Sequence, residues 1–411
     1  QVSMLRTSSS SLDLRLSNSD FLLPVAPRSN RRSIGSLQEL LTLSPENKEK
    51  KDALQESIEK DYPEFDYQAN IEDPHNDILV ILKHFFPSDD LQNIEIKQMT
   101  GGITNVLYLI KGLSIPKVLI RISGENTEEI INREEEIVTL TCLGAINVAP
   151  PLYGRFKNGL LYGFVEGSSL EPYQLKDPNI FKLIASHLGY FHARANVIGI
   201  PTQPVLFDTI EKWLSTADAN QLPEINDMLS NIGFSFKKSK KIIQRFQTEM
   251  SSSSLKIAYC HNDLLAGNII LDSTSNEQKI HFIDFEYGGY NYRAFDIGNH
   301  FCEMMGFELD QNQYPTEEFQ KEWISEYLKS YYLHSSSDIP QNFSCLVDEL
   351  VCTVQRFSLL SHLFWGIWAL IQHQFSTTKE FNYLDYAKLR LTTYLHLFNN
   401  SYSTPDLDET N

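Results

Sequence analysis

Residues 259–272 read YCHNDLLAGNIILD, and residues 279–303, after a short polar insert, read KIHFIDFEYGGYNYRAFDIGNHFCE. This stretch and the residues just before it hold three short apolar runs, and such runs between turn residues predict strands. The runs cover residues 255–259, 269–271 and 280–283. Asp263 and Asn268 follow the first run, and Asp284 follows the third. We therefore expect these polar side chains at strand ends, where a loop can present them to a ligand.

The side chains of Asp263, Asn268 and Asp284 are of the kinds needed to transfer a phosphoryl group from a nucleotide. One carboxylate accepts the proton of the attacking hydroxyl, while an amide oxygen and a second carboxylate hold Mg²⁺ on the phosphates. Asp263 and Asn268 are five residues apart, and Asp284 follows 21 residues after Asp263. We predict that Asp263 accepts the proton and that Asn268 and Asp284 bind the metal. The alternative is that all three residues serve only as turn formers or caps.

The order H-x-D-x-x-x-x-N and then I-D-F corresponds to two motifs of protein kinases, H-R-D-x-x-x-x-N and D-F-G. More narrowly, HNDLLAGNI together with IDFEYGGYNYRAFDIGNHFCE resembles the choline/ethanolamine kinase family. Aminoglycoside phosphotransferases share only a sparse skeleton of these residues. The resemblance extends over roughly residues 90–395 through four further segments. These are GGITNVLYLI near Gly101, VLIRISG near Arg121, APPLYGRF near Pro150, and RFSLLSHLFWGIWALIQ near the C-terminus.

This resemblance implies a bilobal protein-kinase-like fold of the α+β class. A small N-terminal lobe with an antiparallel sheet binds the nucleotide over residues 71–165, and a larger, mostly helical lobe carries catalysis and substrate binding over residues 166–400. Residues 401–411 form a tail. Residues 1–70 form a lead whose first part is rich in Ser and Arg and poor in acids. Such a segment cannot bury a core, so we expect it to be disordered with possible short helices. An organelle transit segment is the less favoured alternative.

Composition narrows the class of protein. The chain has 411 residues, 42% of them hydrophobic, which suits a globular enzyme. Its net charge of −18 argues against nucleic acid as a partner and suits a cationic substrate. No apolar run is long enough to span a membrane. Five cysteines without C-x-x-C spacing predict free thiols, no zinc site and a cytoplasmic protein. The oligomeric state stays open, with a homodimer as one possibility.

A glycine-containing segment separates two of the strands predicted in the N-terminal lobe, over residues 94–99 and 106–110. Glycines between strands let backbone N–H groups approach phosphates, although an ordinary hairpin turn is the alternative. The resemblance implies that this loop covers the phosphates of ATP. The residues concerned are Gly101, Gly102, Thr104 and Asn105.

Arg121 ends the third predicted strand, where protein kinases place a Lys. It offers a permanent charge and a fork of donors for phosphate oxygens. The following segment, residues 128–143, predicts a helix with three consecutive acids near its middle. The resemblance implies that one of these acids pairs with Arg121. Glu136 aligns best, while Glu134 and Glu135 stay open as alternatives.

Two acids and one histidine in the central stretch have implied supporting roles. Asp296 is expected at the N-cap of a helix, and the resemblance implies that it braces the catalytic loop. Glu303 lies seven residues further on, about two helical turns, and therefore on the same face. The resemblance places it in the pocket for the substrate cation. His261 belongs to the catalytic segment, where we expect it to brace the loop rather than to do chemistry.

Trp365 and Trp368 are three residues apart, so they share one face of a predicted helix. Such pairs are usually core packing. Here the resemblance implies an aromatic wall that also includes Tyr287 and Tyr386. Aromatic faces attract ammonium groups by roughly 0.5–2 kcal/mol per ring.

The predicted function is phosphorylation of the hydroxyl of ethanolamine or choline, with ATP and Mg²⁺ as cofactors. The resemblance implies the first step of phospholipid headgroup synthesis, the Kennedy pathway. Met304, Met305 and Gly306, which follow Glu303, leave one side of the cage thin and tilt the choice toward ethanolamine. The alternatives are a kinase for another amino alcohol or an aminoglycoside, and a non-catalytic nucleotide or choline sensor. A protein kinase is disfavoured because the A-P-E segment is missing.

Overall fold

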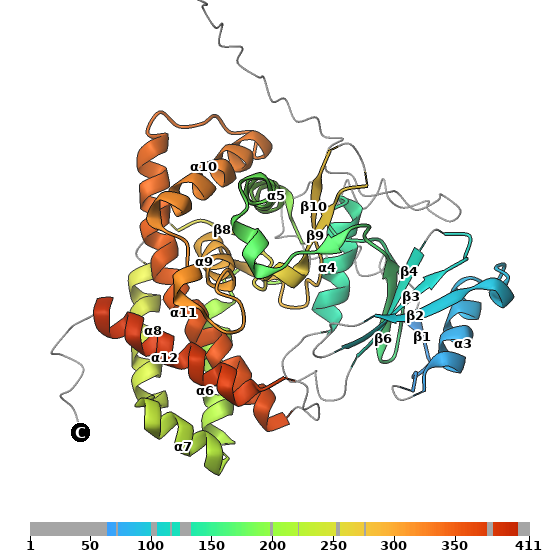
Figure 1. Ribbon diagram of the computed structural model, residues 1–411, viewed down its shortest axis with the longest axis horizontal. Coiled ribbons are helices and arrows are strands. Elements are labelled where there is room, and N and C mark those ends of the chain that lie inside the picture. The colour runs from blue at the N-terminus through green and yellow to red at the C-terminus, as the bar shows by residue number, and fades with distance from the viewer. Residues whose placement is uncertain are drawn as a thin grey trace, which may run out of the picture.

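The computed structural model describes residues 64–70, 73–99, 105–115, 117–123, 133–197, 200–220, 222–251, 255–274, 277–375 and 381–401. They form two lobes, a sheet with one outer helix and a larger helical body (Figure 1). This is the expected α+β, kinase-like division, and it is confirmed. None of the described helices combines the length and apolar character that a membrane span requires.

The N-terminal lobe is a sheet with strand order β1-β5-β6-β4-β3-β2. Its strands are β1 (Glu64–Phe65), β2 (Glu95–Met99), β3 (Asn105–Lys111), β4 (Lys117–Ser123), β5 (Leu152–Phe156) and β6 (Gly159–Gly163). All neighbours pair antiparallel except β1 and β5, which run parallel. On the outer face, helix α3 (His75–Phe85) buries Ile78, Ile81 and Leu82, whose i, i+3, i+4 spacing forms one stripe. A short 3₁₀ turn, Leu91–Asn93, leads into β2.

The N-terminal lobe begins before the expected boundary at residue 71. Strand β1 pairs with β5, and Ala69 is buried against the same sheet. Asn158 fixes this edge, because its side chain accepts a hydrogen bond from the Ala69 N–H (2.9 Å) and donates one to the Ala69 carbonyl (2.8 Å). A two-residue strand carries too little periodicity to be recognised from sequence.

The C-terminal lobe is built around one long helix, α11 (Phe343–Phe375), whose second half is buried on all sides. The helices around it are α5 (Pro178–Arg194), α6 (Leu206–Ala219), α7 (Pro223–Ile232), α8 (Phe236–Ser251), α9 (Arg293–Glu303), α10 (Glu317–His334) and α12 (Tyr383–Ser401). Helix α4 (Arg133–Ala145) follows β4 but packs into the same core through Ile137, Leu140 and Leu143, so it links the two lobes (Figure 1).

Two small sheets in the C-terminal lobe hold the central stretch of sequence. One pairs β7 (Ser168–Ser169), β9 (Ile269–Asp272) and β10 (Lys279–Phe282); the other pairs β8 (Ile257–Cys260) with β11 (Gly289–Tyr292). The three predicted strand runs are confirmed to within about two residues. Further 3₁₀ turns cover Pro172–Lys176, Ala266–Asn268 and Gln311–Gln313.

Candidate active site

The loop of residues 261–268, between β8 and β9, is called the HND loop here. Its first turn needs a residue in the left-handed region, and Asn262 occupies it with φ 65°. The loop closes on itself, because the Asn268 side-chain amide donates to the Asp263 carbonyl (2.8 Å) and to the Asp263 carboxylate (3.2 Å). The amide nitrogen of Asn268 is therefore held by Asp263, so Oδ1 is its donor atom for a cation.

Asp284 is tied to the same loop through the residue before it. The Ile283 N–H donates to the Asn268 carbonyl (3.0 Å), and the Ile283 carbonyl accepts from His261 Nε2 (2.9 Å). Asp284 itself has φ 64°, which turns the chain sharply after β10. The backbone bond from Ile283 to Asn268 thus brings Asp284 next to the HND loop in space, although it lies 16 positions after Asn268, the other predicted metal ligand.

His261 supports the loop from within. Its Nδ1 accepts from the Asp263 N–H (3.3 Å) while Nε2 contacts the Ile283 carbonyl, a pattern that fits the neutral ring with the proton on Nε2. Burial lowers the pKa of His261, which favours the same neutral state. Both ring nitrogens are occupied by backbone groups, in keeping with the expected bracing role.

Asp296 is a hub beneath the HND loop. Its Oδ2 accepts from the His261 N–H (2.8 Å) and from His192 Nε2 (3.0 Å), and its Oδ1 accepts from the Asn262 N–H (2.8 Å). The predicted N-cap position is wrong, because α9 begins at Arg293 and places Asp296 inside its first turn. From there the carboxylate points at the loop instead of at the helix's own N–H groups.

The carboxyl group of Asp263 is nearly buried, and three other acids surround it. Burial raises the pKa of Asp263 well above its usual range, and the charges of Glu303, Asp284 and Glu286 raise it further. The hydrogen bond from Asn268 opposes this shift. A carboxylate in such a setting is a stronger base than an exposed one, and it attracts a cationic ligand.

Arg121 reaches the site from β4 and pairs with Glu136 of α4. Their closest atoms, Nη2 and Oε1, are 2.5 Å apart and both side chains are buried. The expected pairing with Glu136 is thus confirmed, while Glu135 is exposed and the side chain of Glu134 lies outside the described residues. Burial alone would lower the pKa of Arg121, but Glu136 and the neighbouring acids keep it raised.

A bound phosphate could accept a hydrogen bond from a side-chain N–H of Arg121 that has no partner among the described residues. Buried Nε of Arg121 has no hydrogen-bond partner among the described residues, and Nη1 lies 3.9 Å from Asp284 Oδ1. The oxygens of Asn268 and Asp284 are the ligand type that Mg²⁺ prefers. The residues present therefore fit a metal–nucleotide. Gly101, Gly102 and Thr104 lie outside the described residues, as does the side chain of Asn105, which begins β3.

The predicted aromatic residues come together beside the HND loop. The Tyr287 ring lies 5.2 Å from Trp365, whose ring lies 5.3 Å from Trp368, and Trp368 Nε1 donates to the Tyr287 hydroxyl (2.8 Å). Three further aromatic residues, which the sequence analysis did not single out, connect these rings to Tyr386 through contacts with ring centres 5.0 to 5.7 Å apart. These three are Tyr383, Phe381 and Phe307. We call the seven residues the aromatic row.

Phe307 changes the expectation of a thin cage after Glu303. It is 44% exposed, and its ring lies 5.7 Å from Tyr386 and 5.4 Å from Phe381. The aromatic side chain comes one residue after the Met-Met-Gly segment rather than inside it. A turn at Gly306, with φ 65°, redirects the chain there, and no periodic pattern reveals such a turn.

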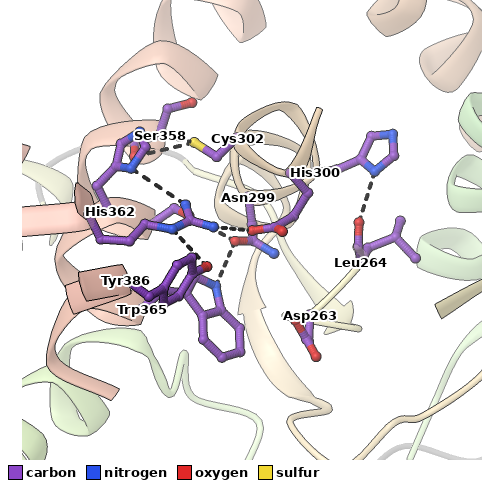
Figure 2. Close-up of polar contacts among 12 residues, drawn as sticks. Asp263, Leu264, Asn299, His300, Cys302, Ser358, His362, Trp365 and Tyr386 are labelled. Atoms are coloured by element: carbon purple, nitrogen blue, oxygen red, sulfur yellow. Dashed lines mark hydrogen bonds and ion pairs between the residues drawn. The ribbon is translucent and has the colours of Figure 1, made fainter. Parts of the chain in front are cut away.

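Asn299 connects the aromatic row to the HND loop. Its Oδ1 accepts from Trp365 Nε1 (2.7 Å) and from the Ser361 hydroxyl (2.8 Å), and its Nδ2 donates to the Asn262 carbonyl (3.3 Å). Figure 2 shows the Asn299–Trp365 contact beside Asp263. Sequence reasoning missed Asn299. The available signal was its spacing of three residues from Asp296, which puts both on one helical face.

Glu303 was expected to face the substrate cation. In the structure it lies at the end of α9, near enough to Asp263 to affect its pKa, but one carboxylate oxygen already binds Arg390 of α12. The sequence did not single out Arg390. Taken together, the nearly buried carboxyl group of Asp263, the acid and amide side chains of Asp284 and Asn268, and the buried Arg121 meet where the two lobes join. Such a site on this fold defines a phosphotransferase of the protein-kinase-like class.

The chain belongs to the choline/ethanolamine kinase family, because residues 96–395 match that family's sequence profile. Ethanolamine kinase 1 of Mus musculus is 37% identical over 332 residues, covering 78% of this chain and 88% of that protein. A Plasmodium vivax ethanolamine kinase structure aligns with a TM-score of 0.69 at 26% identity, covering 87% of this chain and 96% of that one. A choline kinase structure from Cryptosporidium parvum aligns with a TM-score of 0.63 at 26% identity, covering 79% and 95%.

Proposed function

We propose that the protein transfers the terminal phosphoryl group of ATP to the hydroxyl of a small amino alcohol, ethanolamine or choline. The observation that carries this proposal is the contact of Asn299 with both Trp365 and the HND loop. It puts aromatic faces, which suit an ammonium group, within one rigid unit with Asp263, which suits a hydroxyl. An amino alcohol carries both groups a few bonds apart.

In the proposed reaction the alcohol oxygen attacks the terminal phosphorus. The new oxygen–phosphorus bond forms as the bond to the leaving ADP breaks, and Asp263 accepts the hydroxyl proton. Arg121 binds phosphate oxygens through its open Nε. Asn268 and Asp284 would hold Mg²⁺, which when bound offsets the charge of the phosphates. The products are ADP and phosphoethanolamine or phosphocholine.

We propose ethanolamine as the preferred substrate. A primary ammonium donates hydrogen bonds, and Glu303, whose charge acts on Asp263, offers a carboxylate oxygen as acceptor while Asp263 serves the hydroxyl. A quaternary ammonium can use only the aromatic faces and the charge. The ethanolamine kinases of Mus musculus and Plasmodium vivax named above support the same choice.

We also propose a cytoplasmic location for the protein, supported by its five free cysteines.

The decisive experiment measures ADP release in a coupled assay with ATP and Mg²⁺, with ethanolamine and choline in parallel. We expect release that depends on the alcohol, a higher kcat/KM for ethanolamine, and a phosphomonoester product in ³¹P NMR. Release without any alcohol, or none with either, would contradict the proposal. A sensor would bind the alcohol, as measured by calorimetry, without releasing ADP.

Arg121→Lys is expected to raise the KM for ATP by about tenfold or more, because a forked, charge-assisted contact to phosphate is lost. The KM for ethanolamine should change little. The matched control is Arg155→Lys on β5 of the same sheet, where the arginine pairs with Glu64 at 3.4 Å. Initial-rate kinetics on both variants provide the check. A raised KM for ethanolamine with unchanged KM for ATP would refute the assignment.

A further inference from the structure

Arg390 of α12 is fully buried, and its guanidinium contacts two residues proposed for the alcohol pocket. Nη2 donates to Glu303 Oε1, and Nε donates to the Tyr386 hydroxyl (2.9 Å). The guanidinium carbon also lies 5.2 Å from the centre of the Tyr386 ring. One side chain thus holds both an acid and a ring of the aromatic row.

The third side of the guanidinium meets a neutral chain of polar groups. Nη1 lies 3.5 Å from His362 Nδ1, His362 Nε2 lies 3.6 Å from Cys302 Sγ, and the Cys302 thiol donates to the Ser358 carbonyl (3.7 Å; Figure 2). Burial lowers the pKa of His362 well below its usual range, and Arg390 lowers it further. His362 is therefore an uncharged neighbour, and Glu303 is the carboxylate that balances Arg390 among the described residues.

This arrangement governs what Glu303 can offer to a ligand. Its Oε1 is held by Arg390, while Oε2 forms no hydrogen bond with any residue that the structure describes. A carboxylate held at one oxygen presents the other in a fixed direction. Replacing a buried ion pair by apolar residues is often neutral or stabilising, so the pair is weak evidence of a purely structural role.

We propose that Arg390 is a positioning residue for the amino-alcohol substrate, which orients Glu303 and Tyr386 toward the ammonium group. This role rests on the proposed function, since it presumes that the pocket takes an amino alcohol. Arg390 touches neither the hydroxyl nor the phosphate in this scheme. Its loss should therefore weaken alcohol binding without weakening nucleotide binding.

Arg390→Met is expected to raise the KM for ethanolamine by about tenfold or more, since truncating one member of a buried charge pair typically costs that much affinity. The KM for ATP should stay within about twofold. Arg390→Lys, which keeps a cation for Glu303, should recover part of the loss. The matched control is Arg356→Met, because Arg356 pairs with Glu249 on a partly exposed face.

A double-mutant cycle tests whether Arg390 acts through Glu303. In the double variant of Glu303→Gln and Arg390→Met, the rise in the KM for ethanolamine should be clearly smaller than the product of the two single increases, because the part that acts through Glu303 is lost only once. The remaining increase reflects the contact of Arg390 with Tyr386. Melting temperatures accompany every variant. If Arg390→Met does not fold, the test uses Arg390→Lys and Tyr386→Phe, of which the second removes only the hydroxyl. Each of these variants should raise the KM for ethanolamine.

The outcomes separate the two proposals. Wild-type turnover with an unchanged alcohol KM in every Arg390 variant would overturn the positioning role alone. Equal increases in both KM values, or purely additive effects in the cycle, would also overturn it, because they indicate general damage. If the wild-type protein turns over neither alcohol, the proposed function fails and the role of Arg390 fails with it.

Discussion

Asp263→Asn lowers kcat by about 10²- to 10⁴-fold, the expected result of removing the group that accepts the proton. The asparagine keeps the shape of the side chain, and its oxygen can still accept the 3.2 Å hydrogen bond from Asn268. The loop should therefore keep its conformation, and the KM for ATP should stay near the wild-type value. The loss then belongs to the chemical step rather than to nucleotide binding.

The measurement is single-turnover and steady-state kinetics with ethanolamine, with the melting temperature of the variant alongside. Asp272→Asn is the matched control, because Asp272 ends β9 nearby and its Oδ1 caps the turn by accepting from the Thr274 N–H (2.8 Å) and hydroxyl (2.7 Å), bonds that an asparagine oxygen can also accept. The control should keep nearly full activity. An Asp263→Asn enzyme within about tenfold of wild type would show that another group accepts the proton.

Asp296→Asn is expected to lower both activity and stability. The native carboxylate accepts from the His261 and Asn262 N–H groups and from His192, and an amide has only one oxygen to offer. At least one donor then faces the amide NH₂ group. Breaking a buried charged network of this kind costs about 3–5 kcal/mol of the free energy of unfolding. The HND loop should shift as well, so that kcat falls together with stability.

The pH dependence of this loss has a definite sign. Burial would raise the pKa of Asp296, but its hydrogen bond and charge interaction with His192 and its neighbours lower it overall. A carboxyl group with a lowered pKa in the folded state stabilises above its unfolded pKa, about 3.9, and loses this contribution as the pH falls. The stability gap between wild type and Asp296→Asn should therefore be full at neutral pH and shrink in acid.

Urea unfolding at several pH values measures the loss of stability and its pH dependence, and kcat at neutral pH measures the loss of activity. The matched control is Asp177→Asn at the N-cap of α5, where the side chain accepts from the Asn179 N–H (2.8 Å). Asparagine caps helices as well as aspartate does, so this variant should unfold and react like wild type. A stable and active Asp296→Asn protein would disprove the role of Asp296 as the hub of the loop.

Local sequence was sufficient for the core of the site. The strands β8, β9 and β10 and the polar residues after them follow from short patterns, because each depends on residues within one loop or two adjacent elements. The pairing of Arg121 with an acid of the next helix came from the family resemblance, and only the structure selected Glu136 among the three candidates. Strand periodicity and turn chemistry act over a few residues, and a linear reading captures them.

The features that sequence reasoning missed depend on contacts between distant elements. Arg390 lies 87 residues from Glu303, and a charged residue on a helix is normally read as solvent-facing. Asn299 joins the HND loop to Trp365, which lies 66 residues away. Asp296 was expected at a helix cap because it opens the predicted helix, yet two of its partners come from the HND loop and the third, His192, comes from α5. Which charges are buried and which partners they meet is set by how α9, α11 and α12 pack together, and no local pattern encodes that packing.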